Sequence, residues 1–415
     1  MKVFKFGGAS LKSASAIRNV TSIIKSHSNQ LIVVVSAIGK TTDALERIIS
    51  LSQAGKHFED ELNLMKEYHF QIVNDLFKDP KEVSAQLNSL FNELLNKASQ
   101  KGEYDFVYDQ AIGFGEIISS TLVHNFFLSE ELNSEWVDSR KYIHTDSSFR
   151  EGQVEWSVTE KKIKTLEPLM KDKIIVTQGF IGSNSKGETV SLGREGSDFT
   201  AAIYGSSLSA ESVTIWKDVP GVMSADPKRS PYAVVFEELP YKEAAEMTYY
   251  GASVIHPKTV KPLANKGIPL LVKSFIDSTL DGTKIHECII DRIPPLIVHK
   301  ENQCLISCKV TDYSFINEEQ LGTIFQTISK SGIRINLMQN SAISFSFCVD
   351  FRENRVLRLI ETLSKNFEVY YNSGLTLITV KNYDSKTFDE YRGLKGVILE
   401  QSSRAALQVL VRDFK

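Results

Sequence analysis

KFGGAS, residues 5–10, joins a short apolar run at the start of the chain to a segment with helical spacing, residues 11–24. A strand that turns through glycines into a helix offers an anion free backbone N–H groups and the positive end of the helix dipole. Lys5, which we expect to be exposed at the strand end, adds a full positive charge. Gly-Gly turns also serve as plain tight connections, so the motif predicts a phosphate site only together with others.

Composition places the chain among soluble proteins with more than one domain. Its 415 residues suffice for two or three domains, and 48 Lys and Arg against 51 Asp and Glu give a net charge of −3. This near balance argues against nucleic-acid and membrane partners. Cys304 and Cys308 share one face of a predicted strand, so we interpret them as buried apolar residues and expect neither disulfides nor zinc. No signal peptide and no apolar stretch of membrane-spanning length is evident, so we expect a cytoplasmic protein.

The first 290 residues alternate between strand and helix patterns. Residues 31–36 (LIVVVS) form a β-branched run that is typical of a parallel strand buried on both faces. Further strands are predicted at 134–138, 173–178 and 212–217, which indicates an α/β domain with a mostly parallel sheet. Residues 42–101 have helical spacing, interrupted at Asp79-Pro80. His69 lies on the apolar face of this segment, and we interpret it as a core histidine rather than a catalytic one.

The pattern changes after Ile293-Pro294-Pro295, where adjacent prolines favour a domain boundary. Beyond it the predicted order is β-α-β-β-α-β, the pattern of a ferredoxin-like unit. The predicted elements are strands 303–312, 333–338, 343–350, 367–371 and 375–381 and helices 318–331 and 352–366. A second unit begins at Gly374, and its 384–393 segment is too short for a full helix, so we expect it to be truncated. The predicted domains are therefore 1–293, 294–373 and 374–415.

Three further motifs follow KFGGAS: residues 113–116 (GFGE), 192–200 (LGREGSDFT) and 217–227 (KDVPGVMSADP). In this order and spacing, the four motifs resemble those of the aspartate kinases of the amino-acid kinase superfamily, and the resemblance covers almost the whole chain. It implies a three-layer αβα sandwich with a mostly parallel central sheet, followed by α+β ferredoxin-like ACT domains. The length leaves no room for a fused homoserine dehydrogenase, so we expect a monofunctional enzyme.

The resemblance also implies a reaction. An aspartate kinase transfers the γ-phosphoryl group of ATP to the β-carboxylate of L-aspartate, giving 4-phospho-L-aspartate for lysine, threonine and methionine biosynthesis, with ATP and Mg²⁺ as cofactors. Such a transfer depends on positioning and on neutralising negative charge, for which lysines and glycine N–H groups are suited. A carboxylate acceptor needs no general base. The family further implies a homodimer formed through the ACT-like region, and we predict no metal ligands in the chain itself.

Side-chain chemistry suggests a role for five residues. Lys5 can bridge donor and acceptor oxygens during transfer, and Ser36 can add a hydroxyl group near the phosphates. Arg194 can grip a carboxylate through two parallel hydrogen bonds. Glu116 and Asp198 suit the substrate ammonium. The alternatives are a surface lysine, a turn serine and, for the two acids, carboxylates that stabilise a helix N-terminus.

The family assigns roles to further positions. Asp198 corresponds to a carboxylate that orients the cluster, and it joins Lys5 as a predicted catalytic residue. The predicted aspartate contacts are Thr42, Glu116, Arg194 and Ser197. The predicted ATP contacts are Lys5, Gly7, Gly8, Ser36, Lys217, Asp218, Lys228 and Lys258.

Three departures from the family pattern bear on turnover. Ala9 replaces a usual threonine, Glu195 replaces a usual glycine, and Ser253 stands where many relatives carry a lysine that faces ATP, for which Lys258 is a substitute. These changes keep open a second hypothesis, a catalytically weak amino-acid sensor of the same fold. A third, a kinase of another acceptor, is disfavoured by the ACT-like region.

Two positions suggest altered feedback control. Lysine-sensitive relatives carry acidic residues at the positions of Asn336 and Ala342, so two negative charges for an amino-acid effector are missing. We therefore expect weak inhibition by lysine or threonine.

Overall fold

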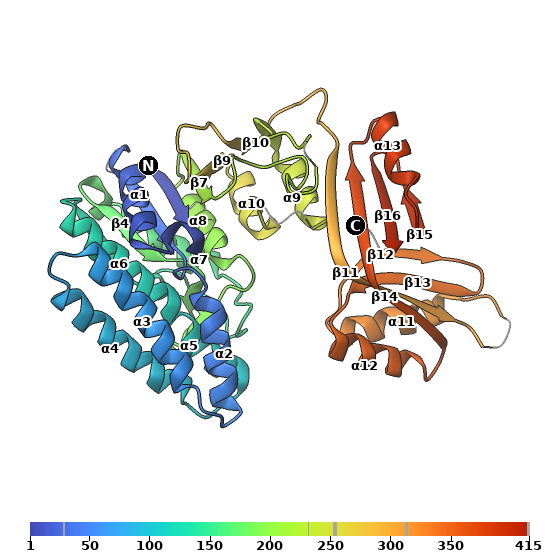
Figure 1. The fold of residues 1–415 in the computed structure, drawn as a ribbon, viewed down its shortest axis with the longest axis horizontal. Helices are drawn as coiled ribbons and strands as arrows, with labels where there is room; N and C mark the ends of the chain where they lie inside the picture. Colours follow the sequence, from blue (N-terminus) through green and yellow to red (C-terminus); the bar gives the residue numbers. More distant parts are fainter. Residues whose placement is uncertain (28–29, 231, 252–254, 312–313, 413–415) are drawn as a thin grey trace. The chain divides into compact units, whose positions relative to one another are not determined.

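The computed structural model describes the chain except residues 28–29, 231, 252–254, 312–313 and 413–415 (Figure 1). It divides into two compact units. The first comprises Met1–Val222, Val235–Thr248 and Ser253–Ile290, and the second comprises Met223–Val234, Tyr249–Ala252 and Asp291–Lys415. Two short internal segments of the predicted 1–293 domain, and its last three residues, thus group with the later part of the chain, an arrangement that local sequence patterns do not reveal.

Within the described residues, the first unit is built on an eight-stranded sheet with the order β3-β4-β2-β1-β7-β9-β10-β8. Neighbouring strands from β3 to β9 are parallel, and only β10 runs antiparallel to β9. The strands are β1 Lys2–Phe6, β2 Leu31–Val35, β3 Ser134–Val137, β4 Ile174–Gln178, β7 Ser212–Lys217, β8 Glu238–Pro240, β9 Leu270–Ser274 and β10 Thr283–His286, with a separate hairpin of β5 Ile181–Ser183 and β6 Thr189–Ser191. The predicted α/β class and mostly parallel sheet are confirmed.

Helices pack on both faces of this sheet. They are α1 Ala14–Lys25, α2 Thr41–Gln53, α3 Glu59–Leu76, α4 Lys81–Ala98, α5 Tyr104–Ile112, α6 Phe114–Ser129, α7 Trp156–Lys164, α8 Gly196–Ser207, α9 Tyr241–Tyr249 and α10 Pro257–Ala264, with 3₁₀ helices η1 Gly8–Leu11, η2 Ser139–Lys141 and η3 Leu169–Lys171. The helix predicted from residue 11 begins later because η1 comes first and Ser13 then caps α1, accepting a hydrogen bond from the Ala16 N–H at 3.2 Å.

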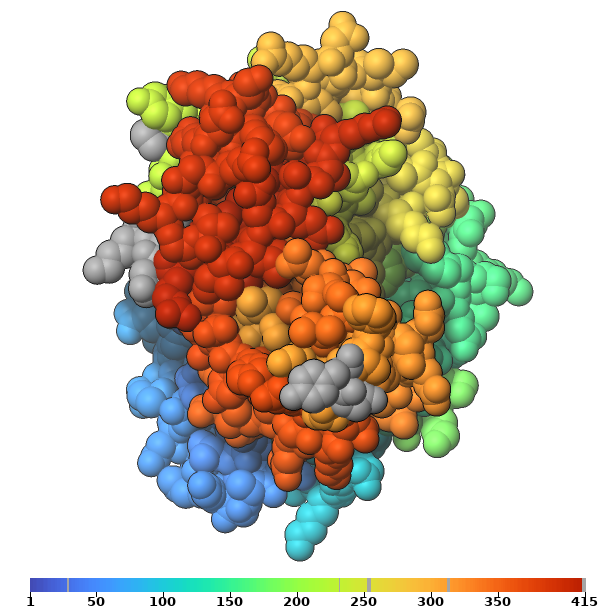
Figure 2. Space-filling model, turned by 90° about the vertical axis from the view of Figure 1, so that its right-hand side faces the viewer, coloured from blue at the N-terminus to red at the C-terminus, as the bar shows by residue number. Residues whose placement is uncertain are grey.

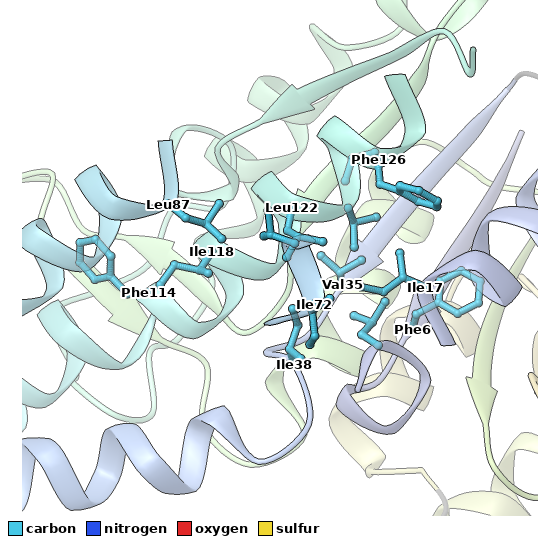
Figure 3. Close-up of a cluster of buried hydrophobic side chains, with 14 of the residues drawn as sticks. Phe6, Ile17, Val35, Ile38, Ile72, Leu87, Phe114, Ile118, Leu122 and Phe126 are labelled. Atoms are coloured by element: carbon cyan, nitrogen blue, oxygen red, sulfur yellow. The ribbon is translucent and has the colours of Figure 1, made fainter. Parts of the chain in front are cut away.

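Alternation along β1 determines what each face of the sheet contacts. Phe4 and Phe6 point into the main apolar core, where side chains of α1, α3, α4 and α6 meet β1 and β2 (Figure 3). Lys5 belongs to the opposite face, which α8 covers. His69 lies in the main core, fully buried, with Nδ1 2.7 Å from the Met65 carbonyl, and burial lowers its pKa to about 4. Its predicted role as a core histidine is confirmed.

One expectation about membranes needs correction. Helices α5 and α6 are separated only by Gly113, whose backbone is helical, so Tyr104–Ser129 forms a 26-residue apolar stretch. In the described part of the chain, it is the one stretch that is long and apolar enough to cross a membrane by length and composition. Most of it is buried inside the first unit, as is usual for a core helix of a globular protein.

The second unit contains a six-stranded antiparallel sheet, counted over the described residues, with the order β12-β13-β11-β14-β16-β15. Its elements are β11 Leu296–Lys309, α11 Glu318–Lys330, β12 Ile335–Asn340, β13 Ser344–Asp350, α12 Glu353–Leu363, β14 Glu368–Lys381, α13 Ser385–Arg392, β15 Val397–Ser402 and β16 Ala406–Arg412. The first six of these elements follow the predicted β-α-β-β-α-β order. Cys304 and Cys308 share one buried face against α11 and α12, as predicted.

The predicted division at residue 374 falls inside a continuous strand. β14 runs through it, and the first half of β11 pairs with the second half of β14, for example Ile297 with Val380. The later half of the unit therefore has four strands, β11, β14, β16 and β15; its C-terminal part is red in Figure 2. The short segment after β14 does form a helix, α13, which Asp384 caps at the Thr387 N–H at 2.8 Å. The second ACT-like unit is thus less truncated than predicted, because residues 296–300 supply its missing strand.

Candidate active site

Several predicted site residues of the first unit lie at the carboxyl ends of the central parallel strands. Lys5 pairs in register with Val34 of β2 and Ile215 of β7, so Ser36 and Lys217 follow at the same edge of the sheet. β1 lies between β2 and β7; the chain runs from β1 to β2 on one side, and α8 leads into β7 on the other. Ligands bind at such switch points of parallel sheets because the strand ends and helix N-termini diverge there.

The glycine loop packs tightly against the end of β2. A Cβ atom on Gly8 would lie 2.7 Å from the carbonyl oxygens of both Ala37 and Gly39, and the Gly39 N–H donates to the Gly8 carbonyl at 3.0 Å. Gly39 has a φ of +56°, a conformation that suits glycine. A Cβ on Gly7 would be 3.5 Å from Lys5 Nζ, so this glycine leaves space beside the ammonium group. Gly39 was missed by the sequence analysis, although a glycine just after a buried strand is a recognisable signal.

Lys5 is buried, which corrects the prediction of an exposed lysine. It is 9% exposed, lies within β1, and forms an ion pair of 2.6 Å from Nζ to Asp198 Oδ1 under the start of α8. Asp198 Oδ2 is 3.7 Å from Lys217 Nζ. Burial raises the pKa of Asp198, but the two lysines outweigh it and hold the pKa below its ordinary value. The three side chains form one cluster, the Lys5–Asp198–Lys217 triad, which has a net positive charge.

The start of α8 is held close to the sheet. Ser197 is buried, and a Cβ on Gly179 would lie 2.4 Å from the Ser197 Cβ, so the turn after β4 fits against this serine only because it has a glycine there. Asp198 lies in the first turn of α8, where a carboxylate also interacts favourably with the helix dipole. From sequence, Asp198 was interpreted either as a residue of the site or as a carboxylate that stabilises a helix N-terminus. The two interpretations are therefore compatible.

Glu116 is a buried carboxylate in the first turn of α6. Its Oε1 accepts a hydrogen bond from the Ala37 N–H at 3.3 Å, and its Oε2 has no hydrogen-bond partner in the described part of the chain. Burial raises its pKa to about 8, although the charge of Lys5 acts in the opposite direction. Ser119 of the same helix donates to the Ser36 carbonyl at 2.7 Å and so ties α6 to the end of β2. A buried acid with an unused oxygen suits the ammonium group of a substrate.

Glu195, one of the departures from the family pattern, joins this cluster. Its φ is +54°, the left-handed conformation that glycine adopts more easily, and its Oε2 is buried with no hydrogen-bond partner among the described residues. Burial raises its pKa, while Lys217 favours its charged form and Asp198 opposes it. The replacement of glycine therefore adds both backbone strain and an acid beside the triad.

Arg194 and Thr42 lie on segments that border the site. Arg194 is exposed, immediately before Glu195, and Thr42 is partly buried in the first turn of α2. Asp218 is exposed directly after β7.

The remaining predicted residues lie elsewhere or outside the described chain. Lys228 belongs to the second unit, where its N–H donates to Asp226 Oδ1 at 2.9 Å. Lys258 lines a separate cavity of the first unit. Ala9 lies in η1 and is exposed, whereas Ser253 lies outside the described residues. Among the residues that the structure describes, no group of three or more His, Cys, Asp or Glu side chains is placed to hold a metal ion.

Comparison with known proteins agrees with this geometry. The family model described as the amino acid kinase family matches residues 1–274. Lysine-sensitive aspartokinase 3 of Escherichia coli (strain K12) is 30% identical over 354 residues, which cover 84% of this chain and 78% of that protein. Bifunctional aspartokinase/homoserine dehydrogenase 2 of Arabidopsis thaliana is 30% identical over 389 residues, or 90% of this chain, and the chain spans only 42% of that relative's length.

A solved structure extends the likeness to the fold. E. coli aspartokinase III in complex with aspartate and ADP (R-state) matches with a TM-score of 0.86 and 26% identity, covering 99% of this chain and 96% of that one. The match extends over both the α/β unit and the antiparallel second unit. The chain belongs to the amino acid kinase family, among the aspartokinases.

Proposed function

We propose that the chain is an aspartate kinase, which transfers the γ-phosphoryl group of ATP to the β-carboxylate of L-aspartate to give 4-phospho-L-aspartate. The reaction is the first step of lysine, threonine and methionine biosynthesis. The observation that carries the proposal is the buried Lys5–Asp198–Lys217 triad at the carboxyl ends of β1 and β7, beside a glycine loop. The likeness to relatives named aspartokinases supports it.

The triad supplies the electrostatic part of phosphoryl transfer. Charge spreads over the phosphoryl oxygens in the transition state, and fixed cations in a buried site stabilise it strongly. Asp198 holds Lys5 within 2.6 Å, so the ammonium is positioned before the substrates bind. Gly7 leaves space at that ammonium for an anionic oxygen. Asp198 acts through the two lysines, whereas Lys5 contacts the reacting phosphoryl group.

The acceptor is recognised by groups of opposite charge. Arg194 is exposed and forms no ion pair in the described part of the chain, so its guanidinium can bind the α-carboxylate of aspartate through two hydrogen bonds. The buried Glu116 takes the ammonium, with Ser197 and Thr42 as hydroxyl partners. Binding of the ammonium favours the ionised form of Glu116, which burial otherwise disfavours.

ATP and Mg²⁺ are the proposed cofactors. Gly8, Ser36, Lys217 and Asp218 line the strand edge where the phosphates would bind, and Lys228 and Lys258 are the remaining predicted ATP contacts. Mg²⁺ is commonly held by substrate phosphates and one or two carboxylates. This fits a chain that has no cluster of three potential ligands in its described part, and Asp218 and Glu195 are the acids available. Bound Mg²⁺ would neutralise phosphate charge.

Two further proposals concern the setting. We infer a homodimer formed through the ACT-like unit and a location in the cytoplasm, although the plant relatives are named chloroplastic. The alternative function is a catalytically weak amino-acid sensor of the same fold. The carboxylate of Glu195 beside the triad favours this alternative because it competes with an anionic substrate for the lysines.

A single assay separates these functions. The protein is incubated with ATP, Mg²⁺ and hydroxylamine, and with aspartate, glutamate or N-acetylglutamate as the acceptor. Hydroxylamine converts an acyl phosphate into a hydroxamate, which is detected as its coloured complex with Fe³⁺. Product with aspartate alone supports the kinase. If aspartate binds in calorimetry but forms no hydroxamate, the sensor is correct, and product only with another acceptor would reject the assignment of aspartate.

A further inference from the structure

A second cavity of the first unit lies away from the triad. It has a volume of about 400 Å³ and is bordered by helices α7, α8 and α10. Helix α8 packs against both α7 and α10, so the cavity follows its outer side. Its lining residues are Gly152, Gln153, Val154, Trp156, Phe199, Ser206, Lys258, Lys261, Pro262, Asn265 and Lys266. None of them belongs to the triad or to the predicted aspartate contacts.

Two aromatic rings form one wall of this cavity. The ring centroids of Trp156 and Phe199 are 6.2 Å apart and the ring planes meet at 68°, an edge-to-face arrangement. Trp156 is the first residue of α7 and remains 40% exposed, although it is a large apolar side chain. A cavity of this size with an available indole face is suited to a planar ligand.

The rest of the cavity is cationic. Lys258, Lys261 and Lys266 line it, and among the described residues no acidic side chain does. Lys266 is held by the Ser206 carbonyl at 2.8 Å and by Glu160 Oε1 at 3.3 Å. Lys258 and Lys261, by contrast, form no ion pair within the described residues, so their charges are available to a ligand.

The position of Lys258 on α10 is electrostatically unfavourable in the absence of an anion. Lys258 is the second residue of α10, where the positive end of the helix dipole disfavours a cation. Lys261 follows three residues later, on the same face, so the two ammonium groups repel each other. An anion bound between them would relieve both interactions.

We propose that this cavity binds a planar aromatic anion. The aromatic part lies against Trp156 and Phe199, and the acidic group is bound by Lys258 and Lys261. The proposal rests on no residue of the triad and on none of the predicted aspartate contacts, and it gives Lys258, otherwise a predicted ATP contact, a different ligand.

The test uses 2-naphthoate as the probe and 2-naphthylmethanol as its uncharged counterpart, with affinity measured by isothermal titration calorimetry on the full chain. We expect 2-naphthoate to bind at least about tenfold more tightly than the alcohol, since one charge-assisted interaction is worth about that factor. Lys261→Glu and Trp156→Leu should each weaken binding of 2-naphthoate by about tenfold or more. Lys242→Glu, which changes an exposed lysine on α9, is the matched control and should have no effect.

Three outcomes would overturn the proposal. They are equal affinity for the two probes, equal loss in the Lys242→Glu and Lys261→Glu proteins, and displacement of 2-naphthoate by ADP, which would assign the cavity to the nucleotide site. Melting curves of each variant identify a loss of binding that arises only from unfolding. If Trp156→Leu fails to fold, Lys261→Glu and the comparison of the two probes still decide the matter.

Discussion

Replacing Lys5 by methionine separates its electrostatic roles in stability and in catalysis. Methionine keeps most of the apolar length of the side chain and removes the ammonium group. In the folded protein this leaves the carboxylate of Asp198, whose side chain is 4% exposed, with only Lys217 at 3.7 Å. The main energetic consequence of Lys5→Met is therefore that the buried negative charge of Asp198 loses most of its compensation.

The expected magnitude follows from this geometry. Removing one partner of a buried ion pair costs about 3–5 kcal/mol, and the remaining lysine places Lys5→Met near the lower figure. About 3 kcal/mol corresponds to a fall in Tm of about 6–12 °C for a unit of this size. Turnover should fall by on the order of 10²-fold or more, because a fixed transition-state cation is lost.

The double variant Lys5→Met/Asp198→Asn provides the decisive comparison. It removes the buried negative charge, so most of the stability should return while turnover remains low. Thermal melting and the hydroxamate assay are measured in parallel, with Lys2→Met on the same strand as the matched control. The reasoning is refuted if Lys5→Met matches Lys2→Met in both Tm and turnover, or if the double variant regains activity.

Four other predictions follow from the site and the second unit. Burial raises the Glu116 pKa to about 8, so the folded state keeps a proton that the unfolded chain releases above its ordinary pKa of 4.5. The contribution of Glu116 to the free energy of unfolding is therefore complete below pH 4.5 and is lost as the pH rises to about 8. Urea unfolding across this range should show a decline in the free energy of unfolding, and Glu116→Gln should remove this decline. Arg194→Lys should raise the KM for aspartate more than that for ATP, and equal increases would point to a nucleotide role. Glu195→Gly should relieve the left-handed strain, stabilise the protein by about 1 kcal/mol and lower the KM for ATP; an unchanged KM would remove Glu195 as a competitor of the nucleotide. Lysine and threonine should inhibit poorly at millimolar concentration, because the Lys300 ammonium already lies 2.8 Å from Asn336 Oδ1; inhibition at micromolar concentration would contradict this.

Local patterns predicted the strands and much of the site because parallel strands bring their carboxyl ends to one edge. The β-branched run 31–36 and the placement of Lys5 and Lys217 next to strand ends were sufficient for that. The burial of Lys5 could not be predicted in this way. Alternation puts it on the same face as Val3, but only the packing of α8 shows that this face is covered and that Asp198 is its partner.

Non-local contacts account for what local patterns could not show. The break expected at Gly374 is bridged because β11 pairs with β14 on both sides of the glycine, and β16 pairs with the second half of β14, Leu375–Lys381. Lys258, which was predicted to contact ATP, lies on α10 and lines the cavity with Trp156. In each case the deciding contact joins residues far apart in the sequence.

The central claim is that the β-carboxylate of aspartate receives the phosphoryl group at the triad. It is tested most directly by ¹³C NMR of the hydroxamate formed from [4-¹³C]aspartate, ATP, Mg²⁺ and hydroxylamine. We expect the labelled carbon to become the hydroxamate carbon, and we expect Lys5→Met to form almost none of this product. A hydroxamate at the unlabelled α-carboxyl carbon, or undiminished product from Lys5→Met, would contradict it.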